Sequence, residues 1–258
     1  MKIATWNVNG IRARQAQVQE WLELEKPDLL CLQEIKAAPE QVPQALQELE
    51  GYWHCWHGQK GYSGVGLHVR RDLAAQAPVF SQPGFDFECR VASVDLGDLT
   101  VMSCYVPNGG KDFFAKMRFL TDLQTHVQDL LARGRQILLC GDLNVTRTDL
   151  DVHPKERRKS AIGQLPEERQ ALEELLGLGL VDLTRMLHSE EAGIYTWWPP
   201  WRQMRERNIG WRIDYILASP EMAATARECL PRREFGTSDH GPLVALLDWP
   251  SVDPSVQP

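Results

Sequence analysis

The sequence predicts an α/β protein in which helices cover β-sheets. Apolar runs of strand length alternate with segments in which apolar residues recur every three or four positions. Some of the predicted strands are separated by helices, whereas others follow one another directly, which is typical of sheets with mixed connections. The chain has 258 residues, 43% of them hydrophobic, and is long enough for one large core. We therefore expect a single domain over residues 1–249.

Eight apolar runs are the predicted strands. Several are apolar without interruption, as in strands buried on both faces of a sheet. Gly97 and Asp98 separate two of the runs and predict a hairpin turn. The eight runs cover residues 2–8, 28–35, 64–70, 91–96, 99–108, 136–145, 212–219 and 241–249.

Three segments have the spacing of amphipathic helices, namely residues 14–24, 113–132 and 166–176. Residues 250–258 contain too few apolar side chains to order themselves, so we expect a loose tail. We find neither a signal segment nor the run of about 18 apolar residues that a membrane span requires. We therefore expect a cytoplasmic protein without membrane contact, and we also expect it to be a monomer. The six cysteines form no C-x-x-C pair, so we expect neither a disulfide framework nor a zinc cluster.

The charge is acidic overall but unevenly distributed. A net charge of -7 argues against non-specific binding of polyanions. Positive side chains nevertheless cluster in "PKERRK", residues 154–159, and between residues 195 and 212. Each cluster taken alone is typical of a solvated loop, yet a local basic face can exist on an acidic protein.

Carboxylates, amides and a histidine gather where the apolar runs stop. Chemistry in sheet-based α/β folds collects at strand ends, because independent strands can aim side chains into one cleft. Each of these residues alone also fits a turn or a helix cap, but so many together favour a site. The group consists of Asn7, Asn9, Glu34, Tyr105, Asn108, Asp142, Asn144, Asp214, Asp239 and His240.

Asp214 is the member that a structural role explains least well. It interrupts "WRIDYILA", which is otherwise an apolar strand, and a buried carboxylate is costly unless it is paired. His240 is a suitable partner, because a carboxylate would orient its ring and favour the imidazolium. Glu34 and Asp239 are hard oxygen donors suited to Mg²⁺, while Asp142 can activate or orient water. Together these groups predict metal-assisted hydrolysis of a phosphodiester.

Seven ordered motifs identify a family. The sequence resembles the exonuclease III and apurinic-apyrimidinic (AP) endonuclease family of Mg²⁺-dependent DNA repair nucleases, within the endonuclease/exonuclease/phosphatase superfamily. The resemblance runs from Met1 to about Trp249 and implies a four-layer α/β sandwich, with two mixed sheets packed face to face and helices outside. The motifs are "TWNVNGIRA", "PDLLCLQEIK", "HGQKGYSGVG", "YVPNG", "GDLNVTRTDLDV", "GWRIDYILAS" and "SDHGPLV".

The resemblance implies a metal end of the site. Glu34 would be the principal ligand of Mg²⁺, or of Mn²⁺ in its place, with Asn9 and Asp239 assisting. Asn7 would belong to the same end. Some family members have aspartate where this chain has Asn9, and the amide contributes no charge, so a lower affinity for Mg²⁺ is one expectation.

The resemblance also implies a hydrolytic end. Asp142 would orient or deprotonate the attacking water, and Asn144 would hold the phosphate. Tyr105 and Asn108 would contact the phosphate or the leaving-group side. His240, oriented by Asp214, would stabilise the charged oxygens of the transition state.

The segment "YTWWPPWRQMRERNIGW" suggests the substrate. Its paired prolines predict a shaped loop. By resemblance, Trp197, Trp211 and Ile213 line a small pocket that accepts a flipped-out sugar without its base, whereas we expect Trp198 to pack in the core. Trp201 falls where some members insert a wedge into the duplex.

Other basic residues would contact the DNA backbone. Lys111 lies where some relatives reach the DNA, although a solvated lysine explains it equally well. Arg157, Arg158 and Lys159 are predicted phosphate contacts.

The resemblance implies a DNA repair nuclease that cuts duplex DNA 5′ to abasic sites and acts on damaged 3′ ends. It leaves the balance between AP endonuclease and 3′→5′ exonuclease activity open. The alternatives are another phosphoesterase of the superfamily, such as a DNase I-like nuclease, a lipid or inositol phosphatase or an RNA deadenylase, and a catalytically silent DNA-binding scaffold. Usable residues at every matched catalytic position argue against the scaffold.

Overall fold

A computed structural model describes residues 1–74 and 76–249. The predicted tail, residues 250–258, lies outside the described residues. Within the described chain, twelve strands form two six-stranded sheets. Their orders are β11-β12-β1-β2-β4-β3 and β5-β6-β7-β8-β10-β9. The sheets are mixed, because β1 pairs with β2 in parallel and β7 with β8 in parallel, while the other pairs are antiparallel.

The strands are β1 (Lys2–Asn7), β2 (Leu29–Gln33), β3 (Tyr52–Gln59), β4 (Tyr62–Arg70), β5 (Phe80–Ser81), β6 (Val91–Leu96), β7 (Leu99–Tyr105), β8 (Gln136–Asp142), β9 (Val181–Asp182), β10 (Asp214–Ala218), β11 (Ala226–Pro231) and β12 (Leu243–Leu247). The α-helices are α1 (Ile11–Glu25), α2 (Gln44–Gln47), α3 (Phe113–Ala132), α4 (Pro166–Gly177), α5 (Leu183–Leu187) and α6 (Pro220–Ala223).

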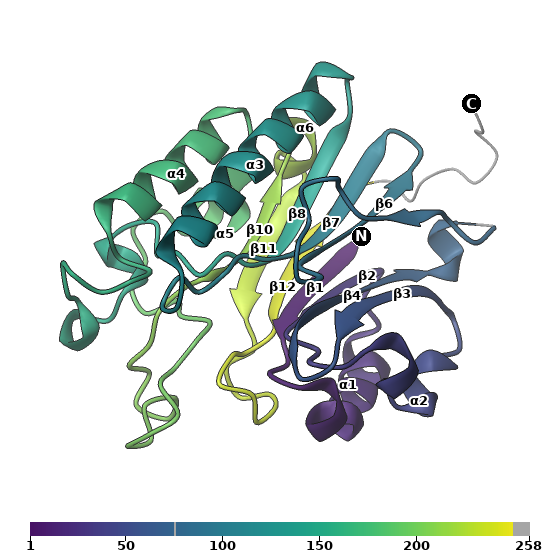
Figure 1. Cartoon of the computed structure of the whole chain (residues 1–258), viewed down its shortest axis with the longest axis horizontal. Helices are drawn as coiled ribbons and strands as arrows, with labels where there is room; N and C mark the ends of the chain where they lie inside the picture. Colours follow the sequence, from purple (N-terminus) through teal and green to yellow (C-terminus); the bar gives the residue numbers. More distant parts are fainter. Residues whose placement is uncertain (75, 250–258) are drawn as a thin grey trace.

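Three apolar cores hold four layers together. The central core combines side chains of both sheets, for example Leu67 of the first and Leu138 of the second, so the sheets pack face to face. A second core joins α3 and α4 to the outer face of the second sheet. A third joins α1 to the first sheet through Trp21. Figure 1 shows the result, with α3 and α4 on one side of the paired sheets and α1 and α2 on the other. The predicted four-layer sandwich is confirmed.

The three predicted helices are all present. The helix predicted at residues 113–132 has those bounds in α3, and Asp112 caps it by accepting a hydrogen bond from the backbone N–H of Ala115 at 2.9 Å. α1 begins three residues before its predicted start, directly after Gly10. It ends at Glu25 and is followed by Lys26, whose φ of 45° is left-handed. Gly97 and Asp98 form the predicted hairpin, with Leu96 opposite Leu99.

Several strand predictions were incomplete. β3 and β11 were missed because both are edge strands that mix polar with apolar side chains and lack a continuous apolar run. β5 and β9 have two residues each, too few for any periodicity. The runs at 99–108 and 136–145 end as strands at Tyr105 and Asp142, so the polar residues beyond them lie in loops.

The strand directions place the polar ends on one edge of the sandwich. Asn7 lies opposite Gln33 in the first sheet, and Tyr105 lies opposite Asp142 in the second. β10 runs antiparallel to β8 and begins with Asp214 opposite Asp142. β12 runs antiparallel to β1, so the residues that precede it reach the same edge. None of the described helices is both long and apolar enough to cross a membrane.

Candidate active site

Side chains from both sheets meet at this edge. Ligand atoms of Glu34, Asp142 and His240 all lie within 4.8 Å of one another, so two carboxylates and one imidazole meet at a single point of the site. Asn7 links the two carboxylates, because its Nδ2 donates to Glu34 Oε1 and to Asp142 Oδ2, each at 2.9 Å. One buried amide at the end of β1 therefore connects the first sheet to the second.

Glu34 is held in a charged setting that the sequence did not reveal. Lys36 Nζ lies 2.7 Å from Glu34 Oε2 and donates to Asn9 Oδ1 at 2.6 Å. Burial alone would raise the pKa of Glu34, but the hydrogen bonds from Asn7 and Lys36 outweigh it and hold this pKa below its usual value. Asn9 and Glu34 have φ of 44° and 50°, a left-handed conformation that non-glycine residues disfavour and that is concentrated at functional sites.

Asp239 joins the metal end through neighbours. Its Oδ1 accepts from Asn9 Nδ2 at 2.9 Å, and its Oδ2 accepts from the indole N–H of Trp197 at 3.0 Å. Burial would raise the pKa of Asp239, but the charge of His240 and these two hydrogen bonds lower it. Both carboxylate oxygens are thus engaged, and Asp239 ties the predicted sugar pocket to Asn9.

His240 and Asp214 form the predicted buried pair. His240 Nδ1 lies 2.9 Å from Asp214 Oδ2, while His240 Nε2 faces Asp142 Oδ2 at 3.8 Å. Burial would lower the pKa of His240, but the charge and hydrogen bond of Asp214, followed by the charges of Asp142 and Asp239, raise it to about 10. The ring is therefore an imidazolium at neutral pH. Asp214 Oδ1 has no hydrogen-bond partner among the described residues.

Asp142 lies at the centre of the hydrolytic end. Its burial, together with the repulsion of Asp214, raises its pKa to about 8, although the positive charge of His240 acts against this. Asp142 Oδ1 accepts from the backbone N–H of Asn144 at 2.9 Å. Asn144 Oδ1 in turn accepts from Asn108 Nδ2 at 3.2 Å. A carboxyl group of raised pKa in a cleft is a candidate base for water activation.

Tyr105 completes the hydrolytic end at the end of β7. It is largely buried, and burial, reinforced by the charges of Glu34 and Asp142, raises the pKa of its phenol far above the usual value. The phenol therefore keeps its proton and can act as a hydrogen-bond donor. All six predicted catalytic residues and the four predicted metal residues lie at this edge.

Aromatic residues of the 193–211 segment lie next to the site. Trp197 and Trp211 pack edge to face with ring centroids 5.3 Å apart, and each is partly exposed. Ile213 is buried two residues beyond Trp211. Trp198 is buried with Tyr195, Met204 and Ile209 in a small core, as expected. The structure thus packs Trp197 against Trp211 and bonds Trp197 to Asp239.

Trp201 and the predicted basic contacts are exposed. Trp201 presents 55% of its surface to solvent, which is unusual for tryptophan. Lys111 is exposed, and its Nζ lies 5.8 Å from the centre of the Tyr62 ring.

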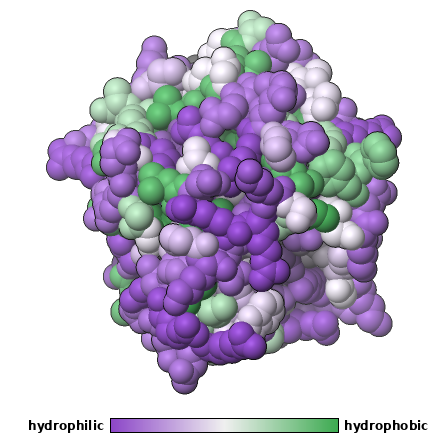
Figure 2. All heavy atoms as spheres, turned by 90° about the vertical axis from the view of Figure 1, so that its left-hand side faces the viewer, coloured by the Kyte–Doolittle hydropathy of each residue, from purple (hydrophilic) through white to green (hydrophobic). Residues whose placement is uncertain are grey.

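Figure 2 shows that the face at the left of Figure 1, the side of α3 and α4, is mainly hydrophilic.

The predicted phosphate contacts lie around one opening. Arg157, Arg158 and Lys159 border a cavity of about 580 Å³ together with Arg169. Arg157 Nε donates to the backbone carbonyls of Asp149 and Val152 at 3.1 and 3.2 Å, so this side chain also braces its own loop.

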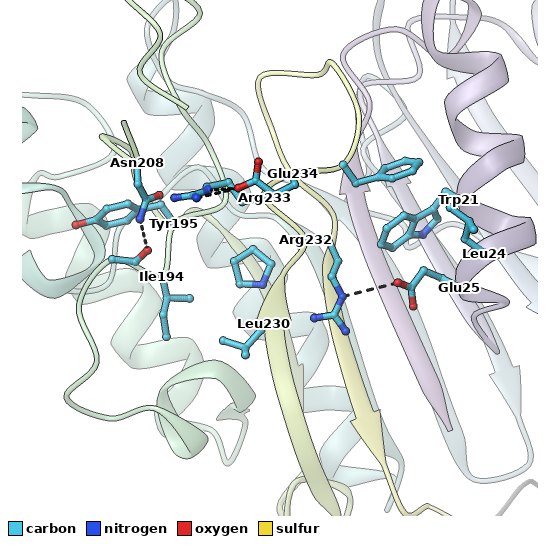
Figure 3. A pocket seen from close by; sticks show the side chains of 13 residues that line it. Trp21, Leu24, Glu25, Ile194, Tyr195, Asn208, Leu230, Arg232, Arg233 and Glu234 are labelled. Atoms are coloured by element: carbon cyan, nitrogen blue, oxygen red, sulfur yellow. Dashed lines mark hydrogen bonds and ion pairs between the residues drawn. The ribbon is translucent and has the colours of Figure 1, made fainter. Parts of the chain in front are cut away.

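A larger apolar cavity lies elsewhere. It has a volume of about 630 Å³ between the end of α1 and the end of β11, and Figure 3 shows Trp21, Ile194 and Leu230 facing it. An ion pair of 3.8 Å joins Arg232 to Glu25 at its border. None of the predicted site residues lines it. They are also absent from the lining of a cavity of about 1050 Å³ between Phe85 and Asp122, so cavity size alone would have pointed away from the catalytic groups.

Comparison with known proteins agrees with the fold and the site. A model of the Endonuclease/Exonuclease/phosphatase family matches residues 4–240. An exodeoxyribonuclease of Bacillus subtilis is 32% identical over 254 residues, covering 96% of this chain and 100% of the relative. Recombination repair protein 1 of Drosophila melanogaster is 35% identical over 256 residues, which cover 96% of this chain but 37% of that relative.

Solved structures give the same result. A 3′-5′ exonuclease (NExo) from Neisseria meningitidis has a TM-score of 0.88 and 35% identity, covering 96% of this chain and 100% of the other. An AP endonuclease from Archaeoglobus fulgidus has a TM-score of 0.86 and 33% identity with the same coverages. The chain belongs to the endonuclease/exonuclease/phosphatase family. Within it, the chain belongs to the exonuclease III and AP endonuclease group, and it is an enzyme of the phosphodiesterase type.

Proposed function

We propose that this protein is a Mg²⁺-dependent DNA repair nuclease that hydrolyses the phosphodiester 5′ to abasic sites in duplex DNA and also acts on 3′ ends. The observation that carries the proposal is the meeting of Glu34, Asp142 and His240 within 4.8 Å at the common edge of the two sheets. Relatives that are named exodeoxyribonuclease and AP endonuclease support the choice of DNA as substrate.

The donor set at the metal end fits a hard divalent cation. Glu34 provides a partly exposed carboxylate, and oxygen donors are the ligands that Mg²⁺ prefers. Glu34 Oε2 and Asn9 Oδ1 already share one cation, because Lys36 Nζ lies 2.7 Å from the first and donates to the second at 2.6 Å. When bound, the cation would neutralise charge on the phosphate and polarise it. Lys36, which pairs with Glu34 in the structure, supplies a second positive charge at this end.

The hydrolytic end provides a base, a cation and hydrogen-bond donors. The ionised form of Asp142 takes a proton from the attacking water, and its raised pKa makes that form a stronger base than an ordinary carboxylate. The His240 imidazolium faces Asp142 and stabilises negative charge that develops on the phosphate oxygens. The protonated Tyr105 donates a hydrogen bond to the same oxygens. The amide nitrogen of Asn144 bonds the Val106 carbonyl and Asp142 in the structure, and it would turn one N–H to the phosphate when substrate binds. The neighbouring carboxylates repel the additional negative charge that the phosphate gains in the transition state, and the bound cation and Lys36 would offset this repulsion.

The aromatic pocket accounts for selectivity. Trp197, Trp211 and Ile213 present apolar surfaces that admit a deoxyribose lacking its base, while a nucleotide with a base needs more room and more unstacking energy. Trp201 would insert between base steps of the duplex, and Lys111 with the cluster at 157–159 would contact the backbone. The single domain over residues 1–249, the monomeric state and the cytoplasmic location remain predictions.

A 3′→5′ exonuclease without AP endonuclease activity is the second candidate, favoured by the similarity to the Neisseria 3′-5′ exonuclease. Two end-labelled duplexes separate the possibilities, one with an internal tetrahydrofuran abasic analogue and one undamaged with a recessed 3′ end. Each is incubated with Mg²⁺ or with EDTA. Metal-dependent incision immediately 5′ to the analogue supports the proposal. Stepwise shortening of the undamaged duplex alone supports the second candidate, and cleavage of neither duplex contradicts both.

A further inference from the structure

A buried lysine lies directly behind the two asparagines of the hydrolytic end. Lys116 belongs to α3 and is 0% exposed. Its ammonium group donates to the backbone carbonyl of Asn144 at 2.8 Å and to that of Asn108 at 3.2 Å. The two carbonyls belong to different loops, one after β8 and one after β7. Lys116 thus holds both main chains at one point.

Glu168 of α4 is the counter-ion of Lys116. It is also 0% exposed, and one of its carboxylate oxygens forms an ion pair with Lys116 Nζ. The other oxygen accepts from the backbone N–H groups of Gly163 and Leu165 at 2.6 and 3.0 Å. The pair therefore joins a third loop, which follows the basic cluster at 157–159, to the two asparagine loops.

The third loop reaches the wall of the predicted sugar pocket. Gly163 has a φ of 88°, and a Cβ atom added there would lie 3.0 Å from the Trp211 ring and 3.2 Å from the Asn144 carbonyl oxygen. Gly163 is therefore pressed between these two residues. Asn144 itself has a φ of 53°, in the left-handed region that costs free energy for a residue other than glycine. Such a conformation persists only where surrounding contacts hold it, and the bond from Lys116 to the Asn144 carbonyl is one of these contacts.

Stability alone explains this pair poorly. A buried ion pair is often no more stabilising than apolar side chains of the same volume. Here, however, each of the three ammonium protons has an acceptor, and the carboxylate also satisfies two backbone donors. The two charged groups bond the backbone of three loops beside the catalytic residues and so fix the positions of these loops. Apolar side chains could not form these bonds.

We propose that Lys116 and Glu168 are positioning residues that set Asn108, Asn144 and the Trp211 wall at the spacing that cleavage requires. The proposal rests on the proposed nuclease function. A misplacement of about 1 Å can lower a rate about 100-fold, so loss of the pair should reduce kcat strongly. KM should change little, because the surface contacts with DNA remain.

The test compares Lys116→Met, Glu168→Gln and the double variant with matched controls. Arg133→Met removes an exposed cation from the residue that directly follows the same helix, and Glu167→Gln removes the exposed carboxylate next to Glu168. Steady-state kinetics on the tetrahydrofuran duplex give kcat and KM. Hydrogen exchange with mass spectrometry, without DNA, follows peptides that cover residues 106–110, 143–148 and 161–165. Circular dichroism shows that each variant is folded.

Lys116→Met should lower kcat about 100-fold and speed exchange in all three loops, with both controls near the wild type. The double variant should lose no more rate than Lys116→Met alone, because the pair acts as a unit. If Lys116→Met fails to fold, Glu168→Gln is judged by the same two measurements. A folded variant with wild-type kcat, a change confined to KM, or unchanged exchange in the three loops would overturn the proposal. If the wild type cleaves neither duplex, the nuclease function fails, while the exchange data still decide whether the pair fixes the loops.

Discussion

Asp214 sets the charge of His240, and Asp214→Asn tests this relation. In the wild type, the hydrogen bond and charge of Asp214 are the largest influences that overcome burial and raise the pKa of His240 to about 10. Asparagine keeps the shape of the side chain but removes the charge. The pKa of His240 should then fall towards the usual histidine value of 6.5 or below, because burial remains.

The size of the effect follows from the two pKa values. A histidine with a pKa of about 10 is about 99% protonated at about pH 8, whereas one with a pKa of 6.5 is only about 3% protonated. At about pH 6 the variant would still be about 76% protonated. If the imidazolium stabilises the transition state, the ratio of the cleavage rate at pH 8 to that at pH 6 should fall about 25-fold in the variant. The change at Asp142 lowers the same rate ratio further. Loss of the Asp214 charge lowers the pKa of Asp142, so more of this base is ionised at pH 6 and the rate at pH 6 rises.

The assay is single-turnover cleavage of the abasic duplex from about pH 6 to pH 9 at saturating Mg²⁺. NMR titration of the imidazole ring gives the pKa of His240 independently. Asp98→Asn, an exposed charge loss in the β6–β7 turn, is the control and should follow the wild-type profile. A variant whose rate ratio equals that of the wild type would refute a catalytic imidazolium. A His240 pKa that stays near 10 would refute the role of Asp214.

Three further substitutions test the substrate side. Trp197→Phe keeps an aromatic side chain but leaves one oxygen of Asp239 without its indole donor. The loss of such a hydrogen bond to a charged group is worth about 1.5–3 kcal/mol, so the Mg²⁺ concentration that gives half-maximal cleavage should change. An unchanged half-maximal concentration would show that this bond does not affect metal binding. Trp201→Ala should weaken binding to the abasic duplex in fluorescence anisotropy by about 1–3 kcal/mol, and unchanged binding and turnover would exclude the wedge. Combined Arg158→Gln and Lys159→Gln should lower the slope of log K against log salt by about 2, whereas an unaltered slope would exclude both phosphate contacts.

The helices and the central strands were predictable because their patterns are local. α3 carries apolar residues at helical spacing between a capping aspartate and Gly134, and β8 is an apolar run long enough to be buried on both faces. The edge strand β3 was not predictable, because half-exposed strands follow no clear pattern. The packing of the two sheets came from family resemblance, since apolar runs do not reveal which sheet a strand will join.

The site was predictable in its members and unpredictable in its connections. Polar residues at strand ends stand out in the sequence because they interrupt apolar runs. The bond between Trp197 and Asp239 joins residues far apart in the sequence, and it depends on one indole orientation. Lys36 follows Glu34 by two positions in "LQEIK" and was a detectable signal, but a surface lysine is the commoner interpretation. Lys116 looked like one polar residue of an amphipathic helix, because only the tertiary structure shows that it is buried.

The most direct test of the account is single-turnover cleavage of the tetrahydrofuran duplex by Asp142→Asn. The amide keeps the size of the side chain and can still accept from the Asn144 N–H, but it cannot take a proton from water. We expect a folded variant that binds the duplex like the wild type and cleaves it at least about 1,000-fold more slowly at saturating Mg²⁺. Near-wild-type cleavage by the folded variant would contradict Asp142 as the base and the assignment of this edge as the hydrolytic site.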